Sequence, residues 1–380
     1  MKAAPGDGTD FPMKASKAAA LEEESGGRTA APAMRAAVYR GPNRLVLETV
    51  PVPEISPDEM LVRVRACGLC ATDLKKIELG LLPPPRIFGH EIAGTVERTG
   101  SRVAGFAVGD RVAVHHHVPC RQCFFCRRRL YSQCAHYRRT GTTAGFEPAG
   151  GGFAEYVRVM DWIVRAGTVR IPDDITFEEA SFLEPLNTCL RALETAGLEP
   201  GEVLAVMGQG PVGLLLTMAA ACRGATVAAL DPIASRRRMA GELGARLALD
   251  PAAGDAAPAL AEITEGRGPD LVIVATADHA AVGQALRLVR RGGRVLLFAQ
   301  TVPGETIPID VARICMEEKR LIGSYSSSVD LQEQAAELIF SRRVPVARLV
   351  SHRFPLAALE DAIRLAAHPT ENSLKVMITP

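Results

Sequence analysis

The stretch EVLAVMGQGPVGLLLTMAAACRGATVAALD, residues 202–231, decides the fold of this chain. It begins as a short apolar strand, passes through three glycines spaced G-x-G-x-x-G, and continues as an apolar helix that ends at a glycine. A second apolar strand then ends at Asp231, 23 residues after Gly208. A lone G-x-G-x-x-G is weak evidence, but a preceding strand, a following helix and this acidic residue together predict a dinucleotide-binding loop.

The three glycines have different expected roles. Gly208 permits a tight turn, Gly210 lets the backbone approach a pyrophosphate, and Gly213 allows helix and strand to pack closely. The pyrophosphate would then lie on the amide groups at the helix start, which includes Pro211 and Val212. The alternative, in which the glycines serve only strand–helix packing, does not explain the acidic residue at the end of the second strand.

Asp231 bears on the choice of cofactor. An acidic side chain at this position hydrogen-bonds the ribose hydroxyls of the adenosine half, and its charge would repel a 2′-phosphate, which favours NAD over NADP. The adjacent arginines Arg236, Arg237 and Arg238 argue for NADP if one of them accepts that phosphate, or they form a solvated helix face. We therefore expect NAD, with Asp231 and Arg236 among its contacts.

Strands and helices continue to alternate beyond residue 231. Helices are expected in IASRRRMAGELGA and HAAVGQALRLVRRGG, and strands in DLVIVAT, GRVLLFA and RLIGSYS. This alternation predicts a parallel, doubly wound sheet with right-handed crossovers, an α/β Rossmann domain that we assign to residues 186–325.

The flanking regions have a different pattern. From Met34, short apolar runs such as EMLVRVRACG are broken by Pro and Gly, which predicts an irregular β-rich domain over residues 34–185. Residues 326–380, with a helix in FPLAALEDAIRLAAH and a strand in LKVMI, are expected to fold back onto that domain. Residues 1–33 are rich in Ala, Gly and charge and lack a continuous apolar segment, so we do not expect a secretory signal. We expect a disordered tail, or an upstream start codon before Met34.

Composition excludes several classes of function. A length of 380 residues fits two domains, and 47% apolar with 23% charged residues is ordinary for a globular protein. The net charge of +1 offers no electrostatic case for nucleic acid or an anionic membrane surface. No apolar run reaches the ~18–20 residues that span a bilayer. We expect a cytoplasmic protein whose clustered cysteines bind metal instead of forming disulfides.

The sequence PCRQCFFCRRRLYSQC contains four of the nine cysteines, Cys120, Cys123, Cys126 and Cys134. Four thiolates at this spacing match a closed tetrahedral zinc site, which would be structural because no coordination position is left open. An iron–sulfur cluster is one alternative, and four free thiols are another. A DNA-binding finger using residues 127–129 is disfavoured, since there is one knuckle, no net basic charge and no recognition helix.

A second metal site is suggested but not established by spacing. Cys70 ends one strand-like run, His90 and Glu91 stand together in GHEIAGTV, and Glu184 precedes a proline in SFLEPLNTCLRAL. A catalytic zinc takes three protein ligands of N, S or O type and keeps a fourth position open. Glu91 could be a ligand itself or could hold one in place. Spacing alone does not show that these residues converge.

From Met34 onward the chain resembles the zinc-dependent medium-chain dehydrogenase family. The resemblance rests on ACGLCATDL, FGHEIAGTV, VGDRV, PCRQCFFCRRRLYSQC, GGFAEYV, EPL and GQGPVG, in this order. It implies a GroES-like catalytic domain beside the Rossmann domain, and a catalytic zinc held by Cys70, His90 and Glu184 with Glu91 adjacent. A glutamate before Pro-Leu, where alcohol dehydrogenases usually carry cysteine, is similar to the polyol (sorbitol-type) branch and to threonine 3-dehydrogenase-like members.

One departure from the family concerns the proton relay, which often runs from a Ser or Thr to a His three residues later. Thr72 matches the first position, but the second is Lys75, so the end of the relay is open. Asp73 is expected to orient a metal ligand.

Two polar stretches have no certain assignment. His115, His116 and His117 alternate faces if they lie on a strand, so they cannot all reach one metal. One of them could line a substrate pocket, but we expect two to be solvated and one to pack against the core. The hydroxyls of GSYSSS, residues 323–328, follow a strand of the open sheet and could bind a polyol or form an ordinary polar loop.

These observations lead to one functional expectation. We expect an enzyme with two zinc ions per chain that transfers a hydride from a secondary alcohol, such as a polyol, sugar alcohol or cyclitol, to NAD. Alternatives are a threonine 3-dehydrogenase-like enzyme, a simple alcohol dehydrogenase and a non-catalytic dinucleotide-binding sensor. The family resemblance also implies a homo-oligomer, a dimer or tetramer.

Overall fold

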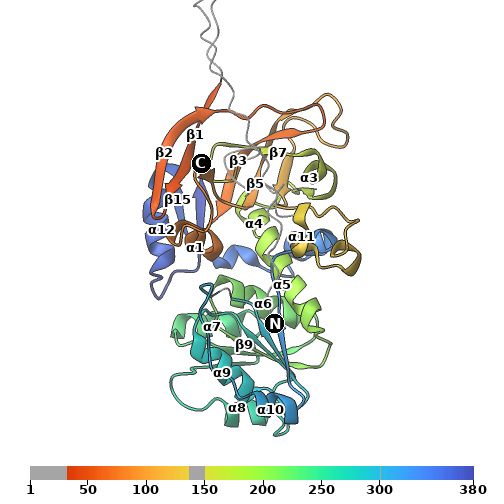
Figure 1. Ribbon diagram of the computed structural model, residues 1–380, viewed down its shortest axis with the longest axis vertical. Coiled ribbons are helices and arrows are strands. Elements are labelled where there is room, and N and C mark those ends of the chain that lie inside the picture. The colour runs from red at the N-terminus through yellow and green to blue at the C-terminus, as the bar shows by residue number, and fades with distance from the viewer. Residues whose placement is uncertain (1–31, 137–149, 300) are drawn as a thin grey trace, which may run out of the picture. The chain divides into compact units, whose positions relative to one another are not determined.

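The parallel sheet expected from residues 202–231 is the organising element of the second half of the chain (Figure 1). The computed structural model describes residues 32–136, 150–299 and 301–380, and residues 33–380 form one compact unit. The tail expected at residues 1–33 lies outside the described residues except for its last two positions.

Six parallel strands pair in the order β11-β10-β9-β12-β13-β14. This order, with the first strand beside the fourth, is that of a doubly wound Rossmann sheet, and it confirms the predicted fold class. The strands are β9 (Val203–Met207), β10 (Thr226–Leu230), β11 (Leu247–Leu249), β12 (Leu271–Val274), β13 (Arg294–Leu297) and β14 (Arg320–Gly323).

Both faces of the central strands of this sheet are buried. Along β9, Leu204 and Val206 belong to one apolar cluster, whereas Ala205 and Met207 belong to another on the opposite face. This burial explains why the strands are continuous apolar runs without polar alternation. The helices that follow these strands are α6 (Pro211–Cys222), α7 (Ala234–Glu242), α8 (Ala257–Glu262), α9 (His279–Leu288) and α10 (Val311–Met316).

The β-rich half contains two further sheets. A three-stranded sheet has the order β2-β1-β4, and a seven-stranded sheet has the order β15-β16-β3-β5-β6-β8, with β7 paired to β3. The bounds are β1 (Ala33–Gly41), β2 (Arg44–Pro51), β3 (Met60–Gly68), β4 (Arg86–Ile87), β5 (Glu91–Thr99), β6 (Arg111–Val114), β7 (Tyr156–Val159), β8 (Thr168–Arg170), β15 (Val350–Pro355) and β16 (Lys375–Thr379). Register shifts in the β3–β5 pair give the sheet its irregularity.

Strand β16 places the end of the described chain beside β3. Met377 and Ile378 pair antiparallel with Gly68 and Cys67, so late residues lie next to the segment that leads to Cys70. This pairing is what later brings Lys375 to the candidate active site.

The remaining helices surround these sheets. α5 begins at Leu183, near the point where the sequence pattern changes, and its apolar face packs on α6. The helices are α1 (Ala71–Glu78), α3 (Asp161–Ala166), α4 (Phe177–Ser181), α5 (Leu183–Ala196), α11 (Gln332–Phe340) and α12 (Leu359–Ala367). Short 3₁₀ turns are η1 (Cys126–Arg128), η2 (Tyr131–Gln133), η3 (Val329–Leu331), η4 (Val346–Leu349) and η5 (Leu356–Ala358).

Within the described ranges, none of the helices combines the length and the apolar character that crossing a membrane requires.

Candidate active site and metal centres

Cys70, His90 and Glu91 come together in the folded chain. Cys70 is the N-cap residue of α1, immediately after β3, while His90 and Glu91 stand at the start of β5. The pairing of β3 with β5, in which Gly68 lies opposite Glu91, brings these two segments side by side. One ligand atom from each residue lies within 4.8 Å of the other two. A partly buried thiol, a buried imidazole and a buried carboxylate in one group match the mixed ligands of a zinc site.

The His90 ring is oriented by Asp73. Nδ1 of His90 lies 3.2 Å from Oδ1 of Asp73, which is fully buried on the inner face of α1. Burial alone would lower the pKa of His90, but the Asp73 carboxylate and the Cys70 thiol outweigh it and hold that pKa well above its usual value. With Nδ1 engaged, Nε2 is the ring nitrogen available to a metal, as in other carboxylate–histidine pairs at metal sites.

Glu91 is fixed from a distant part of the chain. The ammonium group of Lys375, on β16, contacts both carboxylate oxygens of Glu91 and also donates to the carbonyl of Leu69. Both side chains are buried. Burial lowers the pKa of Lys375, but the Glu91 carboxylate and other nearby acidic groups more than offset this and raise it. Paired charges of this kind are stable in the interior only while both partners are present.

Glu184 lies beside the three-residue group and is not one of its members. Its Oε1 is 3.6 Å from Nδ1 of His116 and accepts a hydrogen bond from the Thr188 hydroxyl at 3.1 Å. Burial raises the pKa of the Glu184 carboxyl to about 6, and Glu91 adds to this effect while His90 opposes it. Glu184 is buried, and the charges of His90 and Glu91 both act on its carboxyl group.

The two residues expected in the proton relay both lie on α1. The Thr72 hydroxyl is 2.7 Å from the Cys70 sulfur. Lys75 is half-buried one turn further along the helix.

The three adjacent histidines lie near this site, and the expectation that two of them are solvated is wrong, because His115 and His116 are buried and His117 is partly buried. The ring centroid of His116 is 5.5 Å from that of His90, and its Nε2 is 3.4 Å from the Ser326 hydroxyl. His115 makes the corresponding contact with Ser327 at 3.4 Å. Burial lowers the pKa of His115 to about 4, so this imidazole is neutral.

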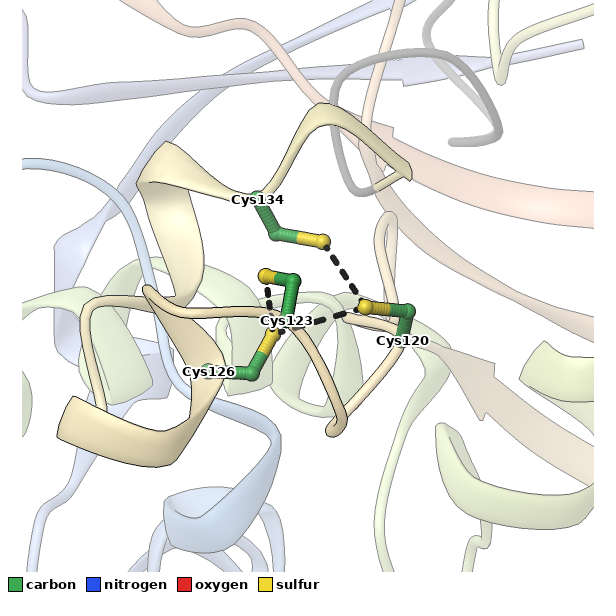
Figure 2. Close-up of side chains that lie close together, drawn as sticks. All are labelled: Cys120, Cys123, Cys126 and Cys134. Carbon is green, nitrogen blue, oxygen red and sulfur yellow. Dashed lines mark hydrogen bonds between the residues drawn. The ribbon is translucent and has the colours of Figure 1, made fainter.

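The four clustered cysteines form a second candidate metal centre (Figure 2). The Cys123 and Cys126 sulfurs are 3.4 Å apart, those of Cys134 and Cys120 are 3.5 Å apart, and those of Cys120 and Cys126 are 3.8 Å apart. Four sulfurs at the corners of a tetrahedron around zinc, with Zn–S bonds of ~2.3 Å, would be ~3.8 Å from one another. The observed separations therefore fit a closed tetrathiolate site.

The environment of the cluster differs between its thiols. Backbone amides of Gln122 and Cys123 lower the pKa of Cys120 to about 6, which favours the thiolate that a metal requires. Burial and the neighbouring thiols raise the pKa of Cys126 to about 12. A cation at the centre of the four sulfurs would favour the thiolate form of each of them.

The lobe that carries the cysteines is attached to other elements. The Tyr131 hydroxyl donates to Asp330 at 2.6 Å, and the Arg191 guanidinium on α5 donates to the carbonyl of Arg129 at 3.0 Å. These bonds connect the lobe to η3 and α5, which also border the candidate active site.

The glycine loop has the geometry that its sequence predicts. Gly208 has a φ of +93°, which favours glycine, and it follows β9 directly. A Cβ on Gly213 would lie 1.8 Å from the Gly208 carbonyl oxygen, so only glycine fits there. Gly210 is the N-cap of α6, and Pro211 and Val212 open that helix, where free backbone amides attract an anion.

Asp231 and Arg236 flank the glycine loop. The Asp231 carboxylate accepts hydrogen bonds from the backbone amides of Gln209, at 2.6 Å, and Ile233, at 2.8 Å. Each carboxylate oxygen can accept a second bond, so ribose hydroxyls remain possible partners. The Arg236 guanidinium is 3.9 Å from Asp231 and equally close to where a Cβ of Gly210 would lie. Arg237 is committed to Asp250 at 3.0 Å.

Sequence reasoning missed two buried residues of this region. Lys375 carried only a weak signal, a lysine inside the apolar strand LKVMI, and nothing in the sequence indicated Glu91 as its partner. Asn187 is fully buried on α5, and no motif indicated it. Its side-chain amide donates to the Ser328 carbonyl and accepts from the Ser328 backbone amide.

Two known families match the chain. Residues 56–173 match the alcohol dehydrogenase GroES-like domain, and residues 211–341 match the zinc-binding dehydrogenase family. Sorbitol dehydrogenase of Bacillus subtilis is 33% identical over 353 residues, which cover 91% of this chain and 97% of that protein. Erythritol/L-threitol dehydrogenase of Mycolicibacterium smegmatis is 32% identical over 369 residues, which cover 91% of this chain and 98% of that protein.

A solved structure is similar over the same span. A protein of Sinorhizobium meliloti 1021, described as a zinc-binding dehydrogenase and bound to NADP, superposes with a TM-score of 0.82 and 32% identity. The match covers 92% of this chain and 100% of that one. The similarity thus includes the β-rich half, the cysteine lobe and the dinucleotide fold.

Proposed function

Because the chain belongs to the zinc-containing medium-chain alcohol dehydrogenase family, we propose that it oxidises a secondary alcohol group of a polyol and passes the hydride to NAD. The observation that carries this proposal is the buried group of Cys70, His90 and Glu91, whose ligand atoms lie within 4.8 Å of one another. Support for a polyol comes from the two polyol dehydrogenases that are 32–33% identical to the chain.

In this proposal the chain's own residues prepare a substrate oxygen for loss of its proton. A zinc ion held by Cys70, His90 and an acidic residue would supply Lewis acidity that lowers the pKa of the substrate hydroxyl. Asp73 fixes the His90 ring, and Lys375 neutralises Glu91, so the site is ordered before substrate arrives.

Proton removal in the proposed reaction is assigned to Thr72. Its hydroxyl is 2.7 Å from Cys70, and it can accept a proton from the substrate while donating its own. Either Glu91 or Glu184 supplies the carboxylate of the site. The choice between them is measurable, because removing a metal ligand lowers zinc content and removing a neighbour does not.

A direct assay tests the proposal. Wild-type protein, with zinc measured by elemental analysis, is mixed with NAD and a panel of polyols, sugars, cyclitols and amino-alcohols, and absorbance is followed at 340 nm. We expect turnover with at least one polyol and two zinc ions per chain. Cys70→Ala should reduce zinc to one per chain and abolish turnover. Activity that survives verified loss of that zinc would contradict the proposal.

The preference for NAD is a separate part of the proposal. Asp231 would repel a 2′-phosphate, while Arg236 could attract it, and a similar protein was solved with NADP. We expect kcat/KM to favour NAD, and we expect Asp231→Ser to shift the ratio toward NADP. A wild-type preference for NADP would contradict this assignment.

We also propose that the chain forms a homodimer through the edge strand β14. In the described sheet β14 pairs only with β13, and Val311, Met316, Leu321 and Tyr325 expose apolar surface on it and on the neighbouring segments. An unpaired edge with exposed apolar side chains favours pairing with a second copy.

A further inference from the structure

The parallel sheet and the seven-stranded sheet carry the two halves of the proposed reaction. The parallel sheet holds the glycine loop for the dinucleotide, and the seven-stranded sheet brings the candidate metal group together through β3 and β5. Transfer of a hydride requires reacting atoms that lie ~3–3.5 Å apart, and a misplacement of ~1 Å can cost about 100-fold in rate. Contacts that fix one sheet relative to the other therefore bear directly on the rate of the proposed reaction.

The first turn of α7 is bonded to the turn that leads into β16. The Ser235 hydroxyl donates to the Glu371 carbonyl at 2.7 Å, and the Arg236 guanidinium donates to the Ser373 carbonyl at 3.3 Å. We call these four residues the α7 clasp. Because α7 follows β10 of the parallel sheet and β16 belongs to the seven-stranded sheet, the α7 clasp joins the two sheets.

The turn that receives these bonds is firmly held. Ser373 is buried, and its backbone amide, at 3.1 Å, and its hydroxyl, at 2.9 Å, both donate to the Thr370 carbonyl. The next backbone amide, that of Leu374, donates to the Ser351 hydroxyl on β15 at 2.8 Å. Lys375 follows directly and contacts a carboxylate of the candidate metal group. Since only Leu374 separates Ser373 from Lys375, a displacement of the turn would be passed to that contact.

The α7 clasp also reaches the glycine loop. Nη1 of Arg236 lies 3.9 Å from the place where a Cβ of Gly210 would be, at the start of α6, where free backbone amides attract a phosphate. Nε of Arg236 is buried, and among the described residues it has no hydrogen-bond partner. A guanidinium has five N–H donors, so this side chain can bind a phosphate of the dinucleotide while it keeps its bond to Ser373. One side chain would thus connect the bound cofactor to the turn before Lys375.

We propose that Ser235 and Arg236 are positioning residues that set the place of the dinucleotide relative to the candidate metal site. Occupation of the glycine loop holds Arg236 against Ser373, tightens the α7 clasp and fixes the turn at residues 370–373, and with it Lys375. The effect on rate rests on the proposed dehydrogenase function. The connection between the cofactor and the turn rests on the contacts alone, so the two can fail separately.

Ser235 gives the cleaner variant, because Arg236 is itself an expected cofactor contact. Ser235→Ala removes one hydroxyl from the first turn of a helix, where alanine is a good helix former, so the fold should persist. The assay uses zinc-loaded protein, saturating NAD and the best polyol of the screen. We expect kcat to fall about 2- to 10-fold, the worth of one hydrogen bond, while the Kd for NADH changes less than about 2-fold.

Two further variants separate the lost bond from other effects of substitution. Ser235→Thr keeps the hydroxyl and should restore most of kcat. Thr195→Ala is the matched control, because the Thr195 hydroxyl also donates to a backbone carbonyl, that of Arg191 at 2.8 Å, but does so within the single helix α5. This control should leave both kcat and NADH binding unchanged.

Hydrogen–deuterium exchange tests the connection without turnover. In the wild type, NADH should slow the exchange of backbone amides in residues 368–376 about 2- to 10-fold, because the turn is held more firmly when the loop is occupied. In Ser235→Ala most of this protection should be lost, and in Thr195→Ala it should remain.

Three results would overturn the inference. They are a kcat and an exchange pattern of Ser235→Ala that match the wild type, a loss confined to NADH binding, and an equal loss of kcat in Ser235→Thr. If zinc-loaded wild type oxidises no alcohol of the screen, the proposed function fails, and the effect on rate fails with it. Exchange still decides the connection in that case, because NADH protection that Ser235→Ala removes supports it and an absence of protection overturns it.

Discussion

At the scale of single residues, the candidate active site depends on two buried partners of adjacent side chains. His90 is oriented by Asp73 from α1, and Glu91 is neutralised by Lys375 from β16. The two residues thus take their partners from two different elements of the fold. Loss of Asp73 or Lys375 should therefore disturb the candidate active site, although neither residue belongs to the group of candidate metal ligands.

Replacing Lys375 by Met should destabilise the protein. The substitution leaves the Glu91 carboxylate buried without its counter-charge, and breaking a buried pair in this way costs about 3–5 kcal/mol. The expected result is a lower denaturation midpoint in guanidinium chloride. The double variant Lys375→Met with Glu91→Gln should recover part of the loss, because no buried charge remains.

The control for that prediction is an exposed pair. Arg267→Met removes the partner of Glu265, and both side chains are mostly exposed to solvent. We expect no measurable change in the denaturation midpoint. If Lys375→Met were equally silent, the buried pair would not contribute as the structure indicates.

A second buried carboxylate gives a pH-dependent prediction. Burial raises the pKa of Glu59, but hydrogen bonds from Arg158 at 2.8 and 2.9 Å and from the Ser56 amide at 2.8 Å outweigh it and lower that pKa. A lowered folded-state pKa means that the contribution is complete above the unfolded value of ~4.3 and is lost as pH falls through the folded value.

The variant Glu59→Gln should therefore lower the melting temperature at pH 7. The expected loss is ~1–3 kcal/mol, as for hydrogen bonds to charged groups, and it should shrink as pH falls below ~4. Melting curves of both proteins at several pH values measure the difference. A difference that stays constant down to pH 3 would contradict the assigned ionisation.

Individual residues were predictable from sequence only where a local motif carried them. Cys70, His90 and the four lobe cysteines stand in short, recognisable stretches, and each belongs to a group that could hold a metal. Lys375 was not predictable, because its role depends on the register between β16 and β3. Register between distant strands is a tertiary property that no single stretch contains.

At the scale of elements, the strand–loop–helix unit β9–α6 is the proposed binding site of the dinucleotide. The loop can take its shape because Gly208 adopts a positive φ and Gly213 has no Cβ. The helix then directs its free amides at the same point.

Gly213→Ala should abolish dinucleotide binding. The added Cβ would lie 1.8 Å from the Gly208 carbonyl oxygen, so the loop must move away from the pyrophosphate position. Titration with NADH, followed by fluorescence, should show loss of binding. Gly283→Ala, in the interior of α9 with only an ordinary contact at 3.6 Å, should bind normally and gain ~0.5–1 kcal/mol of stability. Normal NADH binding by Gly213→Ala would contradict the loop geometry.

The elements themselves were predicted unevenly. The strands β9, β10, β12 and β13 were visible as apolar runs, since burial on both faces makes them continuously apolar. The edge strand β14 was visible in RLIGSYS although most of it is exposed. β11 was missed because its three residues, Leu247–Leu249, are only partly buried and carry little pattern. The helix α5, which carries Glu184 and Asn187, was not identified from SFLEPLNTCLRAL, where a proline follows the glutamate. Proline in the first turn is compatible with a helix.

At the scale of the whole molecule, the proposed dimer is open to a direct test. Leu321 is exposed on the edge strand β14, and a lysine there would place charge in the proposed interface. Leu321→Lys should convert a dimer into a monomer, as measured by size-exclusion chromatography with light scattering. Val108→Lys, at an exposed loop position, should leave the mass unchanged. A monomeric wild type would contradict the proposal.

The pairing of Glu91 with Lys375 also has a consequence for synthesis. The two residues are 284 positions apart, so the carboxylate emerges from the ribosome long before its partner exists. At translation rates of roughly 5–20 residues per second, the interval is roughly 15–60 s. During this interval, the end of the β3–β5 ladder that carries Glu91 must stay open to water, or the ladder must remain unformed. The nascent chain therefore cannot complete the Glu91–Lys375 pair of the candidate active site until synthesis is nearly finished. Holdase chaperones have this interval in which to bind the chain.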